Sequence, residues 1–161
     1  DLHPFPPGRS SVLIKHIFVA LDHCGIYLLV AGTYTPFCLL MPPGRKWTLL
    51  ALIWGLALIG ITIQLVAFLA RRSDSYERFA FVFYLAIGWI PILWAGEYVF
   101  KVLAPMGLDL LIAGGIAYSI GVVFYLWKRI PYGHAVWNLF VIVGSAFHFF
   151  SILYYVVPEA P

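Results

Sequence analysis

The stretch from residue 47 to 70 reads WTLLALIWGLALIGITIQLVAFLA and carries no charged side chain. A helix that crosses a bilayer needs about 20 mostly apolar residues, because each residue advances ~1.5 Å through a hydrocarbon core ~30 Å thick. Membrane-spanning β-strands are only about 10 residues long and alternate between apolar and polar side chains, which this stretch does not. The stretch therefore predicts a transmembrane α-helix.

Four more segments have the same length and character, which predicts an all-α, polytopic bundle of transmembrane helices. The five predicted spans are about 17–41, 47–70, 79–100, 108–127 and 134–157. The composition agrees, since 63% of the 161 residues are hydrophobic and 11% are charged. A soluble domain averages about 45–50% apolar and ~25% charged residues. The connecting loops are too short to form a soluble domain.

The cationic residues of the short loops predict the orientation of the bundle, because Lys and Arg concentrate on the cytoplasmic side. One side carries Arg9, Lys15, Arg71, Arg72, Arg78, Lys128 and Arg129, and the other carries Arg45, Lys46 and Lys101. We therefore expect residues 1–16 to be cytoplasmic and the tail 158–161 to lie outside. The chain has no basic patch with groove-reading elements, so a nucleic-acid partner is not expected.

Ionisable residues inside the predicted spans are informative, because a charge at the bilayer centre costs about 2.5–3.5 kcal/mol on insertion scales. Asp22 lies one to two turns inside the first span, and His134 begins the last span on the same side. His3 precedes the first span, again on that side. An aspartate and two histidines at one depth form a candidate metal or acid–base site, since imidazole suits zinc and a carboxylate can hold a metal-bound water.

Simpler interpretations of the same residues remain open. Asp22 also suits the positive end of a helix that starts at the membrane interface, and His134 also suits an interfacial cap. In the last span His134, Asn138, Val141, Ser145 and His148 share one face of the helix, which we expect to turn inward. His148 lies about 21 Å deeper than His134, so we expect a hydrogen-bonded interior histidine there rather than a ligand of the same site.

Several separated motifs resemble the hemolysin III family, which belongs with the progestin and adipoQ receptors, including the adiponectin receptors. They are LDHCGIYLLVAGTYTPF, FYLAIGWIP, GGIAYSIGVVFYLWKRIPYGHAVW and FVIVGSAFHFF, in this order. The resemblance covers about His3 to Val157. It implies a seven-helix protein of the plasma membrane (the bacterial inner membrane), with the C-terminus outside. The five spans would then be helices three to seven, with helices one and two absent from this sequence.

The resemblance also implies a Zn²⁺ site near the cytoplasmic face. Its ligands would be one histidine late in helix two and an HxxxH pair at the start of helix seven, with an aspartate early in helix three that holds a zinc-bound water. By position, Asp22 is that aspartate, His134 is the first histidine of the pair, and His3 is a candidate for the helix-two ligand. The second histidine of the pair falls on Asn138, where the motif reads HAVWN, and an amide is a weak zinc ligand.

Two functions follow from these residues and this resemblance. In the first, the protein is a zinc-dependent hydrolase that cleaves an amide or ester bond in a ceramide-like lipid, with Asp22 as the catalytic base and His134 on the metal. In the second, it is a non-enzymatic membrane protein with a degenerate metal site, acting as a pore-forming, receptor-like or lipid-homeostasis factor. Membrane lipids are the expected partners in both cases.

Overall fold

A computed structural model describes residues 9–70, 75–127, 129 and 132–159 of the chain. Within these ranges the chain is helical and contains no strand, which confirms the all-α prediction. The helices are α1 (Arg9–Leu39), α2 (Pro43–Leu69), α3 (Ser75–Val102), α4 (Pro105–Leu126) and α5 (Gly133–Ser151). A π-helical turn, η1 (Ile152–Val156), and a 3-10 turn, η2 (Val157–Glu159), continue α5.

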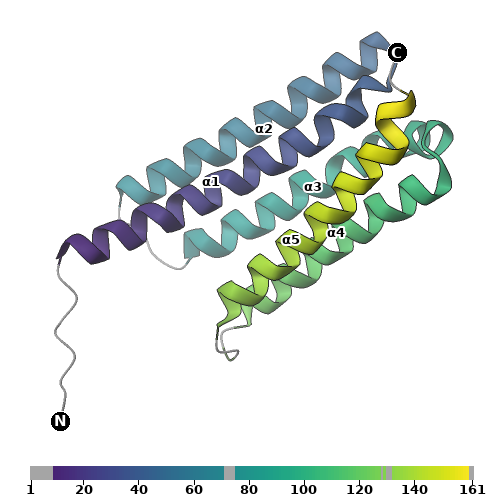
Figure 1. The fold of residues 1–161 in the computed structure, drawn as a ribbon. Helices are drawn as coiled ribbons and strands as arrows, with labels where there is room; N and C mark the ends of the chain where they lie inside the picture. The colour runs from purple at the N-terminus through teal and green to yellow at the C-terminus, as the bar shows by residue number, and fades with distance from the viewer. Residues whose placement is uncertain (1–8, 71–74, 128, 130–131, 160–161) are drawn as a thin grey trace.

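The helices run up and down, so that consecutive helices are antiparallel (Figure 1). α1 packs chiefly against α2, and α4 packs chiefly against α5, while α3 joins the two hairpins. The start of α1, the end of α2, the start of α3, the end of α4 and the start of α5 therefore gather at one end of the bundle. This topology brings the start of α5 to the level of Asp22, near the start of the apolar part of α1.

The helix boundaries follow from proline and glycine. Pro43 and Pro105 stand at the first positions of α2 and α4, where a missing backbone N–H costs nothing. α1 begins at Arg9, directly after Pro-Pro-Gly, and so reaches into the segment 1–16 that the apolar pattern left outside the first span. The apolar part of this helix is Ile17–Leu39. His3 lies outside the described residues.

Among the described residues, four helices are long and apolar enough to cross a membrane: those of α1, α2, α4 and α5. α3 raises the number to five if its two arms, Val82–Trp94 and Gly96–Val102, form one span bent by 63°. Pro91 lies inside α3 and cannot donate to the carbonyl one turn before it. The hydroxyl of Tyr34 on α1 donates a hydrogen bond to the neighbouring carbonyl of Gly88, which compensates for polar backbone inside an apolar bundle.

Glycines bring α4 and α5 unusually close together. A Cβ atom added to Gly121 of α4 would lie 2.9 Å from Cε3 of the Trp137 ring on α5. A Cβ atom added to Gly144 of α5 would lie 2.9 Å from Cε1 of the Tyr118 ring on α4. Small residues at helix–helix contacts are the usual means of close packing in membranes, where the hydrophobic effect does not hold helices together. The α4–α5 hairpin therefore provides a rigid frame for the side chains at its ends.

Candidate metal site

The structure brings together Asp22 of α1 and His134 of α5, two residues that are 112 positions apart. The Nε2 atom of His134 lies 3.2 Å from the Oδ2 atom of Asp22. Both side chains are only partly buried, with exposed fractions of 43% for His134 and 37% for Asp22. The expectation that these two groups share one depth at one end of the bundle thus agrees with the fold.

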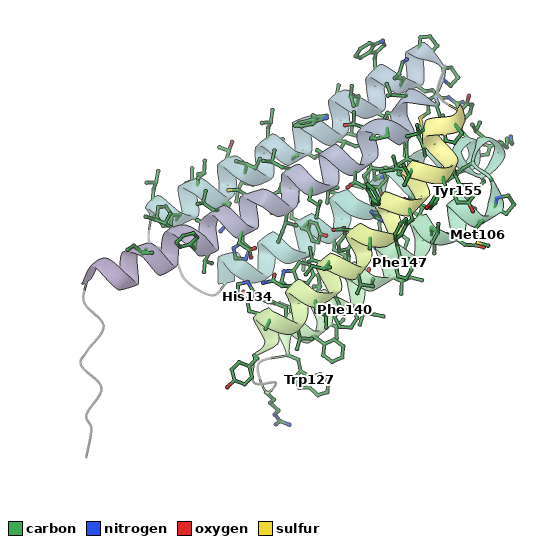
Figure 2. The ribbon with its side chains drawn as sticks, viewed as in Figure 1. Met106, Trp127, His134, Phe140, Phe147 and Tyr155 are labelled. Carbon is green, nitrogen blue, oxygen red and sulfur yellow. The ribbon has the colours of Figure 1, made fainter. Side chains whose placement is uncertain are left out.

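The local structure explains how His134 is held. Tyr132, the N-cap of α5, adopts a left-handed conformation with φ of 64°, and the helix starts at Gly133, so His134 lies in the first turn (Figure 2). The ring of Tyr125, near the end of α4, packs edge-to-face against the His134 ring, with centroids 5.8 Å apart. Tyr125 in turn contacts the fully buried ring of Trp137 at 6.4 Å. These aromatic contacts fix one side of the imidazole.

Asp22 lies about one and a half turns inside the apolar part of α1, which starts at Ile17. Its neighbour His23 is turned away from the site, as the helical period predicts. The His23 ring is 3% exposed, and its Nδ1 donates a hydrogen bond of 2.7 Å to the carbonyl of Val19. Asp22, by contrast, is partly exposed and contacts His134 of α5.

The other predicted ligands do not complete the site within the described residues. Asn138 lies one helical turn after His134, but its side chain is exposed and makes no hydrogen bond to any residue that the structure describes. His3 falls outside the described residues. In the described part of the chain, no group of three His, Cys, Asp or Glu residues could hold a metal ion. The structure thus shows two donors, whereas zinc sites use at least three protein ligands.

The spacing of these two donors is compatible with a shared ion. Two ligands of one tetrahedral zinc ion, each about 2.0–2.1 Å from the metal, stand ~3.3 Å apart. The observed 3.2 Å is longer than the ~2.7–2.9 Å of a charge-assisted N–H···O bond. As a direct ion pair between partly exposed side chains, the contact would contribute only about 0–1 kcal/mol. The pair fits zinc in donor type and spacing but supplies only part of a ligand set.

A second polar layer lies deeper in the bundle, on the predicted inward face of α5. Ser145 shares a hydrogen bond of 2.9 Å with the hydroxyl of Tyr118. His148 is 5% exposed, and its Nε2 donates to the carbonyl of Leu111 at 3.1 Å, which confirms it as an interior histidine. The face is therefore inward at depth, but Asn138, nearer its start, is exposed and departs from that prediction.

Sequence reasoning missed the aromatic residues that support His134. By the helical period Gly114, Tyr118, Gly121 and Tyr125 share one face of α4, but this spacing does not reveal that Tyr125 contacts His134. Nothing in the sequence marked Trp137 as fully buried, because it stands among apolar residues that fit a lipid-facing surface equally well.

Comparison with known proteins identifies the family to which this arrangement belongs. The family model described as "Haemolysin-III related" matches residues 8–149. The chain belongs to the haemolysin III family. It is 45% identical over 148 residues to "Hemolysin-3" of Bacillus cereus and 44% identical over 144 residues to "Hemolysin-3 homolog" of Bacillus subtilis (strain 168).

These matches cover 91% and 89% of this chain, and the chain spans 65% of the length of each bacterial relative. A human relative, "Monocyte to macrophage differentiation factor", is 32% identical over 148 residues, which cover 88% of this chain and 57% of the relative. No solved structure matches the chain. Family and helices together show a multi-pass membrane protein of the haemolysin III family.

Proposed function

We propose that this haemolysin III family protein binds a zinc ion at the end of the bundle that holds Asp22 and His134, and uses it to hydrolyse an amide or ester bond in a membrane lipid. The contact between these two side chains carries the proposal, because it joins an imidazole and a carboxylate from helices that otherwise contact each other little. Imidazole nitrogen and carboxylate oxygen are both common zinc donors.

The roles of the protein groups follow from their chemistry. His134 binds the metal through the Nε2 lone pair that now faces Asp22, which requires the ring proton on Nδ1. The Asp22 carboxylate orients a water molecule and accepts its proton at Oδ2. Tyr125 limits the rotation of the His134 ring. When bound, zinc supplies Lewis acidity, which polarises a substrate carbonyl.

We propose that His3 and the side-chain oxygen of Asn138 supply further donors. His3 is expected on the same side of the membrane as Asp22. Asn138 lies one turn beyond His134 on the same helix. An amide oxygen is a weaker zinc donor than imidazole, so the site should bind zinc less tightly than a site with a histidine at that position.

We also propose that this end of the bundle is cytoplasmic in a bacterial inner membrane, with the C-terminus outside. The supporting observation is the count of seven cationic residues on this side against three on the other. A site at the end of an apolar bundle, open to the exterior at both of its donors, suits a lipid whose polar group lies at the membrane interface.

A second function is favoured by a specific observation. The described residues contain no three-donor cluster, and the bacterial relatives bear the name hemolysin. A non-enzymatic protein that alters membrane permeability would need the Asp22–His134 contact only to fix α1 against α5. The two functions differ in their zinc content and in the effect of replacing Asp22.

Metal analysis of the purified protein tests the proposal. We expect about one zinc per chain, with loss of zinc from His134→Ala and retention of zinc in Asp22→Ala, because Asp22 acts on the water rather than on the metal. Asp109→Ala is the matched control, since Asp109 is an exposed carboxylate near the start of α4, at the other end of the bundle. Equal zinc in His134→Ala and the unaltered protein would overturn the metal site.

The hydrolase and the permeability factor are then separated by two assays on protein in vesicles. Release of fatty acid from a fluorescent ceramide-like lipid should require Asp22 and fail in Asp22→Asn. Leakage of a trapped dye that is unaffected by Asp22→Asn, without lipid cleavage, would instead establish the non-enzymatic function.

A further inference from the structure

A cavity of about 30 Å³ lies inside the bundle, between α1, α3, α4 and α5. Its wall combines apolar side chains with the polar side chains of Thr33, Tyr34, Tyr84, Tyr118 and His148. No charged residue is among those that line it. The cavity is about 21 Å from His134, since His148 follows it by fourteen residues on one helix. It therefore belongs to a different site from the candidate metal site.

His148 has a hydrogen-bond acceptor, its Nδ1 atom, that lacks a donor among the described residues. Its Nε2 atom lies 3.1 Å from the carbonyl oxygen of Leu111, and because a carbonyl only accepts, Nε2 must carry the ring proton. In the neutral imidazole Nδ1 then holds a lone pair. The residue is 5% exposed, and Nδ1 is buried without a hydrogen-bond partner among the described residues. A buried acceptor of this kind normally has a donor.

The neighbouring hydroxyls already have hydrogen-bond partners in the protein. Thr33 donates to the carbonyl of Leu29 at 2.7 Å, and Tyr34 donates to the carbonyl of Gly88. The hydroxyl of Tyr118 shares a hydrogen bond with Ser145.

Tyr84 is the exception among these wall hydroxyls. Its ring is 3% exposed, and its hydroxyl makes no hydrogen bond to any residue that the structure describes. His148, with its buried acceptor, and Tyr84, with this hydroxyl, are both among the residues that line the cavity.

We propose that this cavity binds a water molecule. The water donates one hydrogen bond to Nδ1 of His148 and forms a second hydrogen bond with the hydroxyl of Tyr84. The size fits, because a buried water needs a cavity of about 10–15 Å³ by the same measure, so this cavity of about 30 Å³ has room for at least one molecule. The charge also fits, since the wall offers neither a carboxylate for a cation nor a cationic group for an anion. The site joins α3 to the α4–α5 hairpin through a polar bridge in the middle of the bundle.

Nitrogen NMR of the protein in nanodiscs, with ¹⁵N-labelled histidine, tests this site directly. The His148 signals are assigned by their loss in His148→Gln. We expect an unprotonated Nδ1 with the chemical shift of a hydrogen-bonded acceptor and a transfer of magnetisation from water to this ring. Tyr84→Phe should move the Nδ1 signal toward the shift of a free acceptor and weaken the transfer.

Tyr154→Phe is the matched control, because Tyr154 is 61% exposed on η1 and does not line the cavity. It should leave the His148 signals unchanged. A free Nδ1 acceptor without transfer from water would overturn the proposal, and so would a protonated Nδ1. The measurement on the unaltered protein decides the question even if a variant fails to fold.

Discussion

Replacement of Gly114 by alanine should destabilise the bundle strongly, because Gly114 is where α4 meets His148. A Cβ atom at this position would overlap the Cδ2 and Nε2 atoms of the His148 ring and approach the carbonyl oxygen of Gly144 to 3.0 Å. The backbone oxygen cannot move without separating the helices. The ring can move only by giving up its hydrogen bond to the carbonyl of Leu111.

The size of the effect follows from three contributions. Overpacking of a well-packed core costs about 1–3 kcal/mol. The loss of the hydrogen bond leaves a buried donor and a buried acceptor unpaired, which costs about 1–3 kcal/mol more. Alanine gains about 0.5–1 kcal/mol over glycine inside a helix. We therefore expect Gly114→Ala to lower the free energy of unfolding by about 1–5 kcal/mol.

Gly115→Ala is the matched control, since it makes the same chemical change one residue further along α4. A Cβ atom there would lie 3.4 Å from Cζ2 of Trp89, an ordinary van der Waals contact. Only the helix propensity then changes, so the free energy of unfolding should stay the same or rise by up to about 1 kcal/mol.

Unfolding of both variants in mixed micelles, titrated with SDS and followed by tryptophan fluorescence, measures this difference. Gly114→Ala should unfold at a clearly lower SDS fraction than Gly115→Ala. Equal midpoints for the two variants would refute the close packing of α4 on α5 and the burial of His148 between them.

Three further predictions concern the candidate metal site and the orientation of the chain. Asn138→His should raise zinc affinity about 10-fold or more, equivalent to ~1.4 kcal/mol, in competition with a chelator; unchanged affinity would remove Asn138 from the site. Tyr125→Leu should weaken zinc binding about 10-fold or more, because the aromatic ring that supports His134 is lost. Tyr125→Phe keeps the ring and should keep the zinc affinity. Equal zinc affinities for the two variants would show that the ring does not position His134. A cysteine at Arg78, in a chain without Cys24 and Cys38, should resist membrane-impermeant labelling in intact cells, and rapid labelling would reverse the orientation.

The helices could be predicted from sequence because length and apolarity alone decide whether a segment can cross a bilayer. Their ends were less predictable. α1 begins at Arg9 rather than near residue 17, since the polar residues before the apolar run are still compatible with a helix. α3 bends by 63° between Trp94 and Gly96, beyond Pro91, and the apolar pattern of the chain did not indicate the size of this bend.

The candidate site was predictable in depth but not in its lateral contacts. The up-and-down topology places Asp22 and His134 at one level, but it does not say that α1 and α5 approach each other there. Tyr125 and Trp137 were missed because aromatic residues near span ends fit the membrane interface as well as an interior contact. Asn138 was predicted to face inward from the helical period, but it is exposed, whereas its neighbour Trp137 is fully buried.

Anomalous X-ray diffraction at the zinc edge, from crystals of the protein purified in the presence of zinc, shows whether His134 and Asp22 hold a metal ion. We expect one strong peak within coordination distance of Nε2 of His134 and beside the carboxylate of Asp22. A structure with the His134 ring and the Asp22 carboxylate in direct contact, and with no zinc peak near them, would contradict this expectation.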